Sequence, residues 1–372
     1  MSVSCEKDIT IHVAGGCPVP ALKTWSNAAP TGRNFDYNIG NDTNDIAFVT
    51  STGIAWVIPS QDDATWFVDS YNMAAASPIS FVGLFANDDG AFPGAEAIMY
   101  VPATDTVVIV RQHFNGATYD IWLSFVASNG TEISHLTGLT TETLRNNFAF
   151  VDKTGLAASF LGWISGTDLY LVNVTARSTT SHAVVPGPTA AICYSCVTDS
   201  FFVIQNNDLR EYNRADLALK NVYVGAAIGC NQIDYIKSTQ EVWVWPFSSV
   251  GPFNVRIINP STGALKATMA TADGFSGWLN DSSVCRSYHE KLNAWCIPGP
   301  TPGLSGNPII YYFYDVVSRT LKKQIDISGQ FNAPMFNWFA QVMDVADGSV
   351  FLSGSNYNPP GVQLGIFEIG TS

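Results

Sequence analysis

A ten-residue pattern that recurs seven times constrains the fold of this chain more than any other feature. Six of the seven copies open with an aromatic or large apolar residue. Each copy continues through turn-prone residues that usually include Thr, and ends in mostly apolar residues. The copies are FVTSTGIAWV from Phe48, YVPATDTVVI from Tyr100, FVDKTGLAAS from Phe150, YSCVTDSFFV from Tyr194, YIKSTQEVWV from Tyr235, SYHEKLNAWC from Ser287 and MDVADGSVFL from Met343. A repeat at steps of 41 to 56 residues predicts one fold built from similar units.

Each copy has the chemistry of a β-hairpin. Thr-Asp, Thr-Gly and Asp-Gly pairs at its centre favour a tight turn. The second arm is apolar at consecutive positions, as in Val107–Ile109 and Val242–Val244, which indicates a strand buried on both faces. Inner strands of a propeller blade are buried in this way between neighbouring blades. The repeat therefore predicts an all-β fold, a seven-bladed β-propeller with four-stranded blades.

An outer half follows most copies. It is an alternating strand that ends in Asn or Asp, then a turn, then a further strand. Third strands are predicted within segments such as Leu209–Leu219, Asn254–Leu265 and Ile310–Leu321. Fourth strands are predicted at Ile79–Leu84, Ile133–Thr137, His182–Val185, Asn221–Val224, Ala267–Thr271 and Lys323–Ile327.

The last repeat supplies a third strand at Val362–Ser372 and no fourth. Asp8–Val13 alternates like a strand and has no blade of its own, so we predict that segment 1–14 pairs with the last blade and closes the ring. Segment 15–44 is rich in Gly, Pro and Asn and is predicted to be an extended connection across the ring or against a neighbour, anchored by Trp25 and Phe35. Residues 45–372 would then form the propeller.

The hairpins, together with the turn NPSTGAL from Asn259, resemble degenerate seven-bladed propellers of the YVTN and NHL-like kind. The resemblance covers nearly the whole chain from Asp45. The Trp-Asp dipeptide of WD-repeat propellers and the Gly-Gly of kelch blades are absent from the blades. The resemblance implies a ring with a central channel and exposed loops, and it implies no activity, because this architecture carries many functions.

Charge and hydropathy exclude several partners. The net charge is −13, and the longest basic run is Lys322-Lys323, which argues against binding to nucleic acid or anionic lipid. No apolar run approaches the roughly 20 residues of a membrane span, and Met1–Gly16 does not read as a secretory signal peptide. Charged residues make up only 13% of the chain, which suits a protein held in an assembly or working outside a cell. We therefore expect synthesis in the cytoplasm, followed by a place in a virion or an extracellular location.

Motifs for catalysis or cofactors are weak. The five histidines share no metal-ligand spacing, and neither a P-loop nor a nucleophile elbow occurs, so no metal or cofactor is predicted. Ser60–Trp66 resembles the Asp-box of sialidase-type propellers but lacks its Gly and occurs once. Thr262-Gly263 resembles quinoprotein blades, but their stacking Trp does not recur. Loop carboxylates leave a propeller hydrolase or lactonase open; they are Asp62, Asp63, Asp88, Asp89 and Asp120.

The seven cysteines are expected to be reduced thiols, because their number is odd and no signal peptide precedes them. Cys193 and Cys196 lie in a predicted strand, where residues three apart point to opposite sides, so they are not expected to hold one metal. Cys285 and Cys296 lie on the two arms of one hairpin and could be diagonal neighbours that form a disulfide.

Candidate partner contacts lie mainly in long loops, and they are aromatic. They are Trp245, Phe247, Phe253, Tyr119 and Tyr357, with Trp25 and Phe35 from the N-terminal segment. Exposed aromatic rings can fill a protein pocket or stack on sugars, although Trp245 and Phe253 could instead pack onto their own blade. The sequence favours a non-enzymatic structural or interaction protein, most specifically a component of a virus particle such as a phage tail or head appendage, with other proteins of that assembly as partners. The alternatives are a glycan-binding module, for example for host-surface glycans, and a propeller hydrolase or lactonase.

Overall fold

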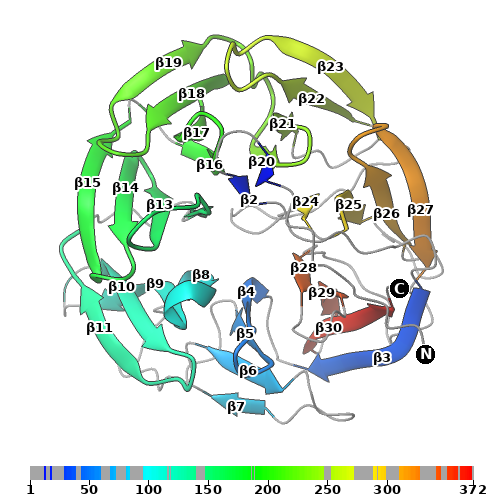
Figure 1. Ribbon diagram of the computed structural model, residues 1–372. Helices are drawn as coiled ribbons and strands as arrows, with labels where there is room; N and C mark the ends of the chain where they lie inside the picture. The colour runs from blue at the N-terminus through cyan, green and yellow to red at the C-terminus, as the bar shows by residue number, and fades with distance from the viewer. Residues whose placement is uncertain are drawn as a thin grey trace, which may run out of the picture.

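The computed structural model describes most of the chain and shows seven four-stranded antiparallel sheets arranged in a ring (Figure 1). The described residues are 12–13, 17–18, 29–38, 43–59, 68–72, 81–83, 95–114, 117, 119–139, 147–185, 187, 189–246, 253–271, 288–290, 292–298, 310–326, 341–344, 350–358 and 361–370. Within these residues, no helix is long and apolar enough to cross a membrane.

The first four sheets are each continuous in sequence. The first contains β4 (Thr43–Val49), β5 (Ile54–Pro59), β6 (Asp69–Asn72) and β7 (Phe81–Gly83). The second contains β8 (Ala95–Val101), the 3-10 turn η1 (Pro102–Thr104), β9 (Thr106–Phe114), β10 (Tyr119–Ala127) and β11 (Glu132–Leu136). The third contains β12 (Asn147–Val151), β13 (Phe160–Ser165), β14 (Asp168–Asn173) and β15 (Ser178–Val184), and the fourth β16 (Thr189–Ser195), β17 (Ser200–Gln205), β18 (Asp208–Asn213) and β19 (Leu219–Tyr223).

The remaining sheets follow the same order except at the end of the chain. The fifth contains β20 (Gln232–Ile236), β21 (Glu241–Trp245), β22 (Asn254–Ile258) and β23 (Leu265–Ala270), and the sixth β24 (Tyr288–His289), β25 (Ala294–Pro298), β26 (Ile310–Asp315) and β27 (Thr320–Asp326). The seventh contains β28 (Gln341–Asp344), β29 (Val350–Asn358), β30 (Gly361–Gly370) and the N-terminal strand β3 (Ala29–Asn38). A separate two-stranded sheet pairs β1 (His12–Val13) with β2 (Cys17–Pro18).

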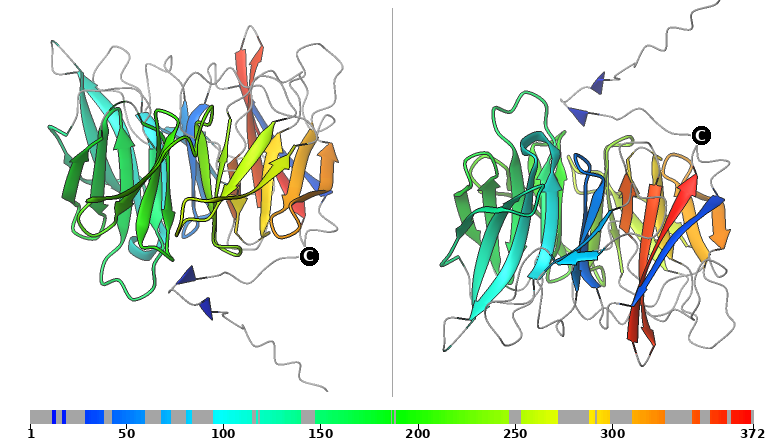
Figure 2. Two further views of the ribbon diagram at one scale, coloured as in Figure 1. Left: turned by 90° about the horizontal axis from the view of Figure 1, so that it is seen from above. Right: turned by 90° about the horizontal axis from the view of Figure 1, so that it is seen from below.

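The first strand of each sheet lies nearest the centre of the ring (Figure 1), and the sheets stand side by side around it (Figure 2). These inner strands contact one another in order from β4 through β8, β12, β16 and β20 to β24, and β28 of the last sheet contacts β4 of the first. The architecture is therefore propeller-like and all-β, as the repeat predicts. The predicted outer strands also fall within β7, β11, β15, β19, β23 and β27, to within a few residues.

The strand that completes the last sheet does come from the N-terminal region, but it is not the predicted one. Segment Ala29–Asn38, expected to be part of an extended connection, forms β3 and pairs antiparallel with β30, with Phe35 opposite Ile366. The described part of Asp8–Val13 pairs instead with β2. The prediction was wrong because β3 carries Pro30 and Gly32 and has a register shift between Pro30 and Asn34, so it lacks a regular two-residue alternation.

The first turn of five of the sheets has a common backbone form. In four of the sheets a residue with positive φ precedes the second strand: Gly53, Asp105, Asp199 and Gln240. Asn293 takes the same role in the sixth sheet, where Tyr288 pairs with Trp295 as Tyr235 pairs with Val242. The sixth copy of the repeat therefore begins at Tyr288, one residue later than predicted. In the third copy the second strand starts at Phe160, after the residues that the repeat assigned to it.

The core lies between neighbouring sheets. All six residues of β17 and all five of β21 are buried, which confirms that the continuous apolar arms are covered on both faces. Apolar clusters join the first sheet to the second, the second to the third, the third to the fourth and fifth, and the fifth to the sixth. Trp56, Trp163, Trp243 and Trp295 are among the largest fully buried side chains, and each buries enough apolar surface to contribute on the order of 2–3 kcal/mol.

Candidate functional site

Four neighbouring sheets, the third to the sixth, present equivalent turn residues directly after their inner strands. In each of these sheets an aromatic residue is the second-last residue of the inner strand, and the turn residue follows it by two positions. The four turn residues are Asp152, Cys196, Lys237 and Glu290. Lys237 forms ion pairs with Asp152 and, at 2.6 Å, with Glu290, and its side chain is only 9% exposed. One ammonium group thus joins the third, fifth and sixth sheets.

Cys196 is bonded to the N-terminal segment. It forms a disulfide with Cys17, with a Cα–Cα distance of 5.3 Å, and both residues are buried. The expectation that all cysteines are reduced is therefore wrong for this pair. The suggested bond between Cys285 and Cys296 is wrong too, because Cys296 is a free thiol, as are Cys193 and Cys230.

The inner strands β12, β16, β20 and β24 line a cavity of about 150 Å³ beside these turns. Its charged groups have partners from the protein itself. Besides the Lys237 pairs, the buried Asp234 accepts hydrogen bonds from the indole nitrogens of Trp245 at 3.2 Å and Trp295 at 3.0 Å. Buried carboxylates are stable only when paired or hydrogen-bonded, so these contacts serve the packing of the ring.

A nucleophile is not evident in this cavity. Cys193 lines it, but burial, and then the charge of Asp234, raise the pKa of its thiol well above the ordinary value. The neutral thiol is the unreactive form. No group of three or more His, Cys, Asp or Glu side chains in the described part of the chain is placed to hold a metal ion.

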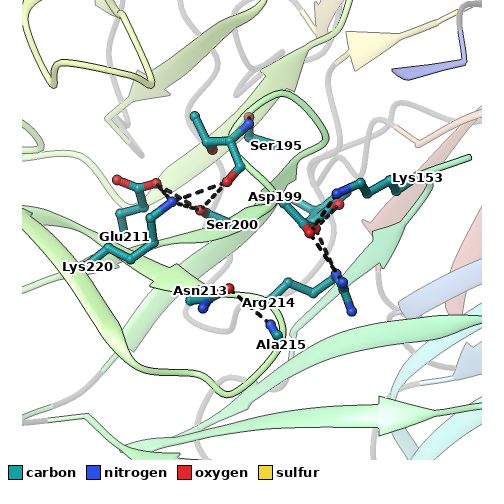
Figure 3. Close-up of polar contacts among 11 residues, drawn as sticks. Lys153, Ser195, Asp199, Ser200, Glu211, Asn213, Arg214, Ala215 and Lys220 are labelled. Carbon is teal, nitrogen blue, oxygen red and sulfur yellow. Dashed lines mark hydrogen bonds and ion pairs between the residues drawn. The ribbon is translucent and has the colours of Figure 1, made fainter. Parts of the chain in front are cut away.

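Polar side chains join neighbouring sheets on the same turns. Asp199 accepts hydrogen bonds from Arg214 of its own sheet and from Lys153 of the third sheet, each at 2.7 Å (Figure 3). Tyr194 of its own sheet also donates to it, at 2.7 Å. Burial alone would raise the pKa of Asp199, but hydrogen bonds from Arg214, Lys153 and Tyr194 lower it below the ordinary value. The same contact type recurs at two other junctions, where Ser51 reaches Asp105 and Ser238 reaches Asn293.

A second network lies within the fourth sheet. Glu211 is buried and accepts hydrogen bonds from Ser200 at 2.8 Å and Asn221 at 2.7 Å, and it forms an ion pair with Lys220 at 2.8 Å (Figure 3). Tyr223 adds a further hydrogen bond at 2.9 Å. Burial opposes ionisation of Glu211, but hydrogen bonds, chiefly from Lys220, lower its pKa. These contacts fix the outer strand β19 against the body of its sheet.

Of the aromatic contact candidates, two have described side chains, and both of these are buried. Trp245 and Phe253 are buried, and both rings pack edge-on against Trp295 of the next sheet, so they belong to the core. Tyr119, Tyr357 and Phe35 are strand residues opposite Phe114, Val362 and Ile366. Phe247 and Trp25 lie outside the described residues.

Of the five candidate loop carboxylates, the structure describes one. Asp62, Asp63, Asp88 and Asp89 lie outside the described residues. Asp120 is placed in β10, opposite His113 of β9. The propeller hydrolase or lactonase alternative, which would need loop carboxylates to converge, therefore stays a prediction.

An exposed apolar strip runs along the outer edge of the fourth sheet. Leu219 is 48% exposed, Val222 38%, Val224 84% and Ile228 63%. We call these four residues the fourth-sheet edge. Hydrogen bonds fix the turn that carries Val224 and Ile228. The amide of Ala227 donates to the carbonyl of Asn207 at 2.9 Å, and that of Gly225 donates to the carboxylate of Asp208 at 2.9 Å.

The sequence analysis placed an outer strand at this edge but did not single it out as a contact surface. The available signal was the apolar Val222 and Val224 in an outer strand, where the outward face is expected to be polar. In the described residues β19 pairs only with β18, so its other edge offers backbone groups that have no strand partner.

Comparison with known proteins supports the fold and shows neither a family nor a function. No protein-family model matches the chain, and no curated protein does. Among solved structures, a chain from a crystal structure of the mitotic checkpoint complex matches with a TM-score of 0.59, over 99% of this chain and 98% of that chain. The sequence identity is 12%, so the likeness shows the shared architecture alone. The class defined by the fold is thus an all-β, propeller-like protein.

Proposed function

We propose that this chain is a closed seven-bladed propeller that acts without catalysis as an interaction protein of a larger assembly, most specifically as a component of a virus particle. The contact between β28 and β4, and the pairing of β3 with β30, support closure of the ring. The charge-poor, acidic sequence suits a protein held in an assembly. The similar solved chain also comes from a protein complex.

The single observation that carries the proposal is the fourth-sheet edge. Four aliphatic side chains with exposed fractions of 38% to 84% lie within ten residues. They are on and next to β19, whose outer edge pairs with no other strand among the described residues. We infer that the occupant is an extended, apolar segment of a partner protein that adds to β19 as a further strand. Main-chain hydrogen bonds would supply affinity, and the apolar side chains would supply specificity.

A protein segment suits this surface better than a sugar does. Sugars are held by stacking on aromatic rings, whereas the large apolar side chains that are exposed in the described part of the chain are all aliphatic. Glycan binding and a propeller hydrolase stay predictions, because the loop aromatics and loop carboxylates on which they rest are largely undescribed.

The test is sedimentation of the native protein and of two variants introduced into its source. The proposal expects the native chain to travel with a large particle, and Leu219→Lys with Val224→Lys to shift it to the free fraction. Val317→Lys is the matched control, since Val317 is 65% exposed but lies in a turn of the sixth sheet. A native chain that sediments as a free monomer would contradict the assembly role. Equal particle binding by both variants would contradict the fourth-sheet edge as the contact.

A further inference from the structure

Aromatic rings make up much of the lining of the cavity beside the first turns. They come from the inner strands of four sheets, β12, β16, β20 and β24. Phe148, Tyr194 and Tyr235 are buried, and Phe150 and Tyr288 are half-buried. The cavity volume of about 150 Å³ leaves room for a small organic molecule, because an apolar protein cavity of roughly this size takes up benzene.

Two of these rings are held in place by their hydroxyl groups. Tyr194 donates a hydrogen bond to Asp199 at 2.7 Å, and Tyr288 donates one to Asn293 at 3.1 Å. Both acceptors lie in the first turn of their own sheet, directly before the second strand. The two rings are therefore fixed beside the cavity. The face of such a ring carries negative potential and attracts cations.

The ion pairs at the cavity leave a surplus of negative charge. Asp152 and Glu290 both pair with Lys237, and within the described residues neither carboxylate has a second ion pair. Two carboxylates thus share one ammonium group. The buried Asp234 adds a further carboxylate to the lining, in which Lys237 is the one basic side chain. A lining of this charge attracts cations and repels anions.

Solvent reaches the charged end of the cavity. The side chain of Glu290 is 40% exposed, so a dissolved cation can approach it directly. Phe148, Tyr194 and Tyr235 are buried, and contact with these rings would remove a ligand largely from water. Attraction between a cation and an aromatic ring is strongest where water is excluded.

We propose that this cavity binds a small alkylammonium ion of the kind that choline represents. The cationic head lies against the aromatic rings, and it balances the negative charge that Lys237 leaves uncompensated between Asp152 and Glu290. The site shares no residue with the fourth-sheet edge, so its test is independent of the assembly role.

The experiment measures binding of choline to the full-length chain by isothermal titration calorimetry. The matched ligand is the uncharged analogue of choline in which a tert-butyl group replaces the trimethylammonium group, so that shape is kept and charge is lost. We expect choline to bind about tenfold more tightly than this alcohol. Equal affinities, or no binding of choline, would overturn the proposal.

Two pairs of variants locate the site. Glu290→Gln removes the surplus charge with little change in size and should weaken choline binding about threefold. Glu132→Gln is its control, because Glu132 is an ion-paired carboxylate on the outer strand β11, away from the lining. Phe150→Leu removes a lining ring and should reduce the preference for choline over its analogue. Phe160→Leu is its control, since Phe160 is half-buried in β13 and does not line the cavity.

The same measurements can contradict the site. Equal choline binding by Glu290→Gln and Glu132→Gln, or equal preference in Phe150→Leu and Phe160→Leu, would place choline elsewhere. Displacement of choline by an equal concentration of potassium chloride would indicate a site for inorganic cations instead. Thermal unfolding checks that each variant is folded. Should Phe150→Leu fail to fold, the carboxylate pair and the two ligands still decide the outcome.

Discussion

Single carboxylates and amides at the first turns decide how neighbouring sheets are joined. The last residue of this turn, directly before the second strand, has a positive φ. Where that residue is Asp105, Asp199 or Asn293, its side chain accepts a hydrogen bond from the preceding sheet. Asp and Asn tolerate the left-handed conformation better than most other residues. One residue therefore serves both the turn and the contact between sheets.

Asp199 allows a direct test at this scale. Asp199→Asn removes the negative charge between Lys153 and Arg214, and we expect a loss of about 1–2 kcal/mol in the free energy of unfolding, because the network is partly exposed. Chemical denaturation measures the loss. Asp216→Asn is the matched control. Asp216 is exposed, and within the described part of the chain its carboxylate accepts a hydrogen bond from the nearby amide of Ala218. Equal loss in both variants would contradict the role given to Asp199.

The same residue sets a pH dependence. The pKa of Asp199 is lowered in the folded chain, so the folded state favours the ionised carboxylate. Its contribution is then fully present above the unfolded value of about 3.9 and is lost as the pH falls through the lower folded value. The stability difference between the native chain and Asp199→Asn should be constant from pH 5 to 8 and shrink below about pH 4. A difference that instead grew on acidification would contradict this assignment.

At the scale of elements, the turn between β22 and β23 docks on the fourth sheet. Gly263 in that turn has φ of +69°, and a Cβ added there would fall within the ring of Tyr223. Gly263→Ala should therefore lower the free energy of unfolding by about 1–3 kcal/mol beyond the backbone cost. Gly229→Ala is a close control, because Gly229 has φ of +68° and open space around its Cβ position. Thermal unfolding of the two variants measures the difference, and equal shifts would contradict close packing at Tyr223.

The sequence predicts the elements well where their signals are local. The hairpins were located because a continuous apolar arm and a turn lie within ten residues, as at β20 and β21. β3 was missed because Pro30, Gly32 and a register shift hide its period. The Cys17–Cys196 bond was missed for another reason: 179 residues separate its ends, and only the closure of the ring brings them together.

The candidate contact surface was less predictable than the fold. Aromatic residues in long loops suggested a rim, but Trp245 and Phe253 pack into the core against Trp295, a contact between sheets that no sequence period encodes. The exposed edge at Val222 and Val224 depends on which strand is outermost and on what covers it. Both the position of the outermost strand and its covering depend on how the sheets are assembled, which no local sequence pattern encodes.

At the scale of the whole molecule, the N-terminal region supplies a strand to the sheet formed by the C-terminal end of the chain. Pairing of β3 with β30 gives the last sheet the fourth strand that its own repeat lacks. It also covers β30, whose edge would otherwise be free to pair with other chains.

Cysteine cross-linking tests this closure most directly. Asp36 and Gly365 are directly opposite each other in the paired strands, where Cα atoms lie close enough for a disulfide. The account predicts that Asp36→Cys with Gly365→Cys forms that cross-link on mild oxidation and raises the melting temperature, whereas His12→Cys with Gly365→Cys forms none. A cross-link between positions 12 and 365, with none between 36 and 365, would contradict it.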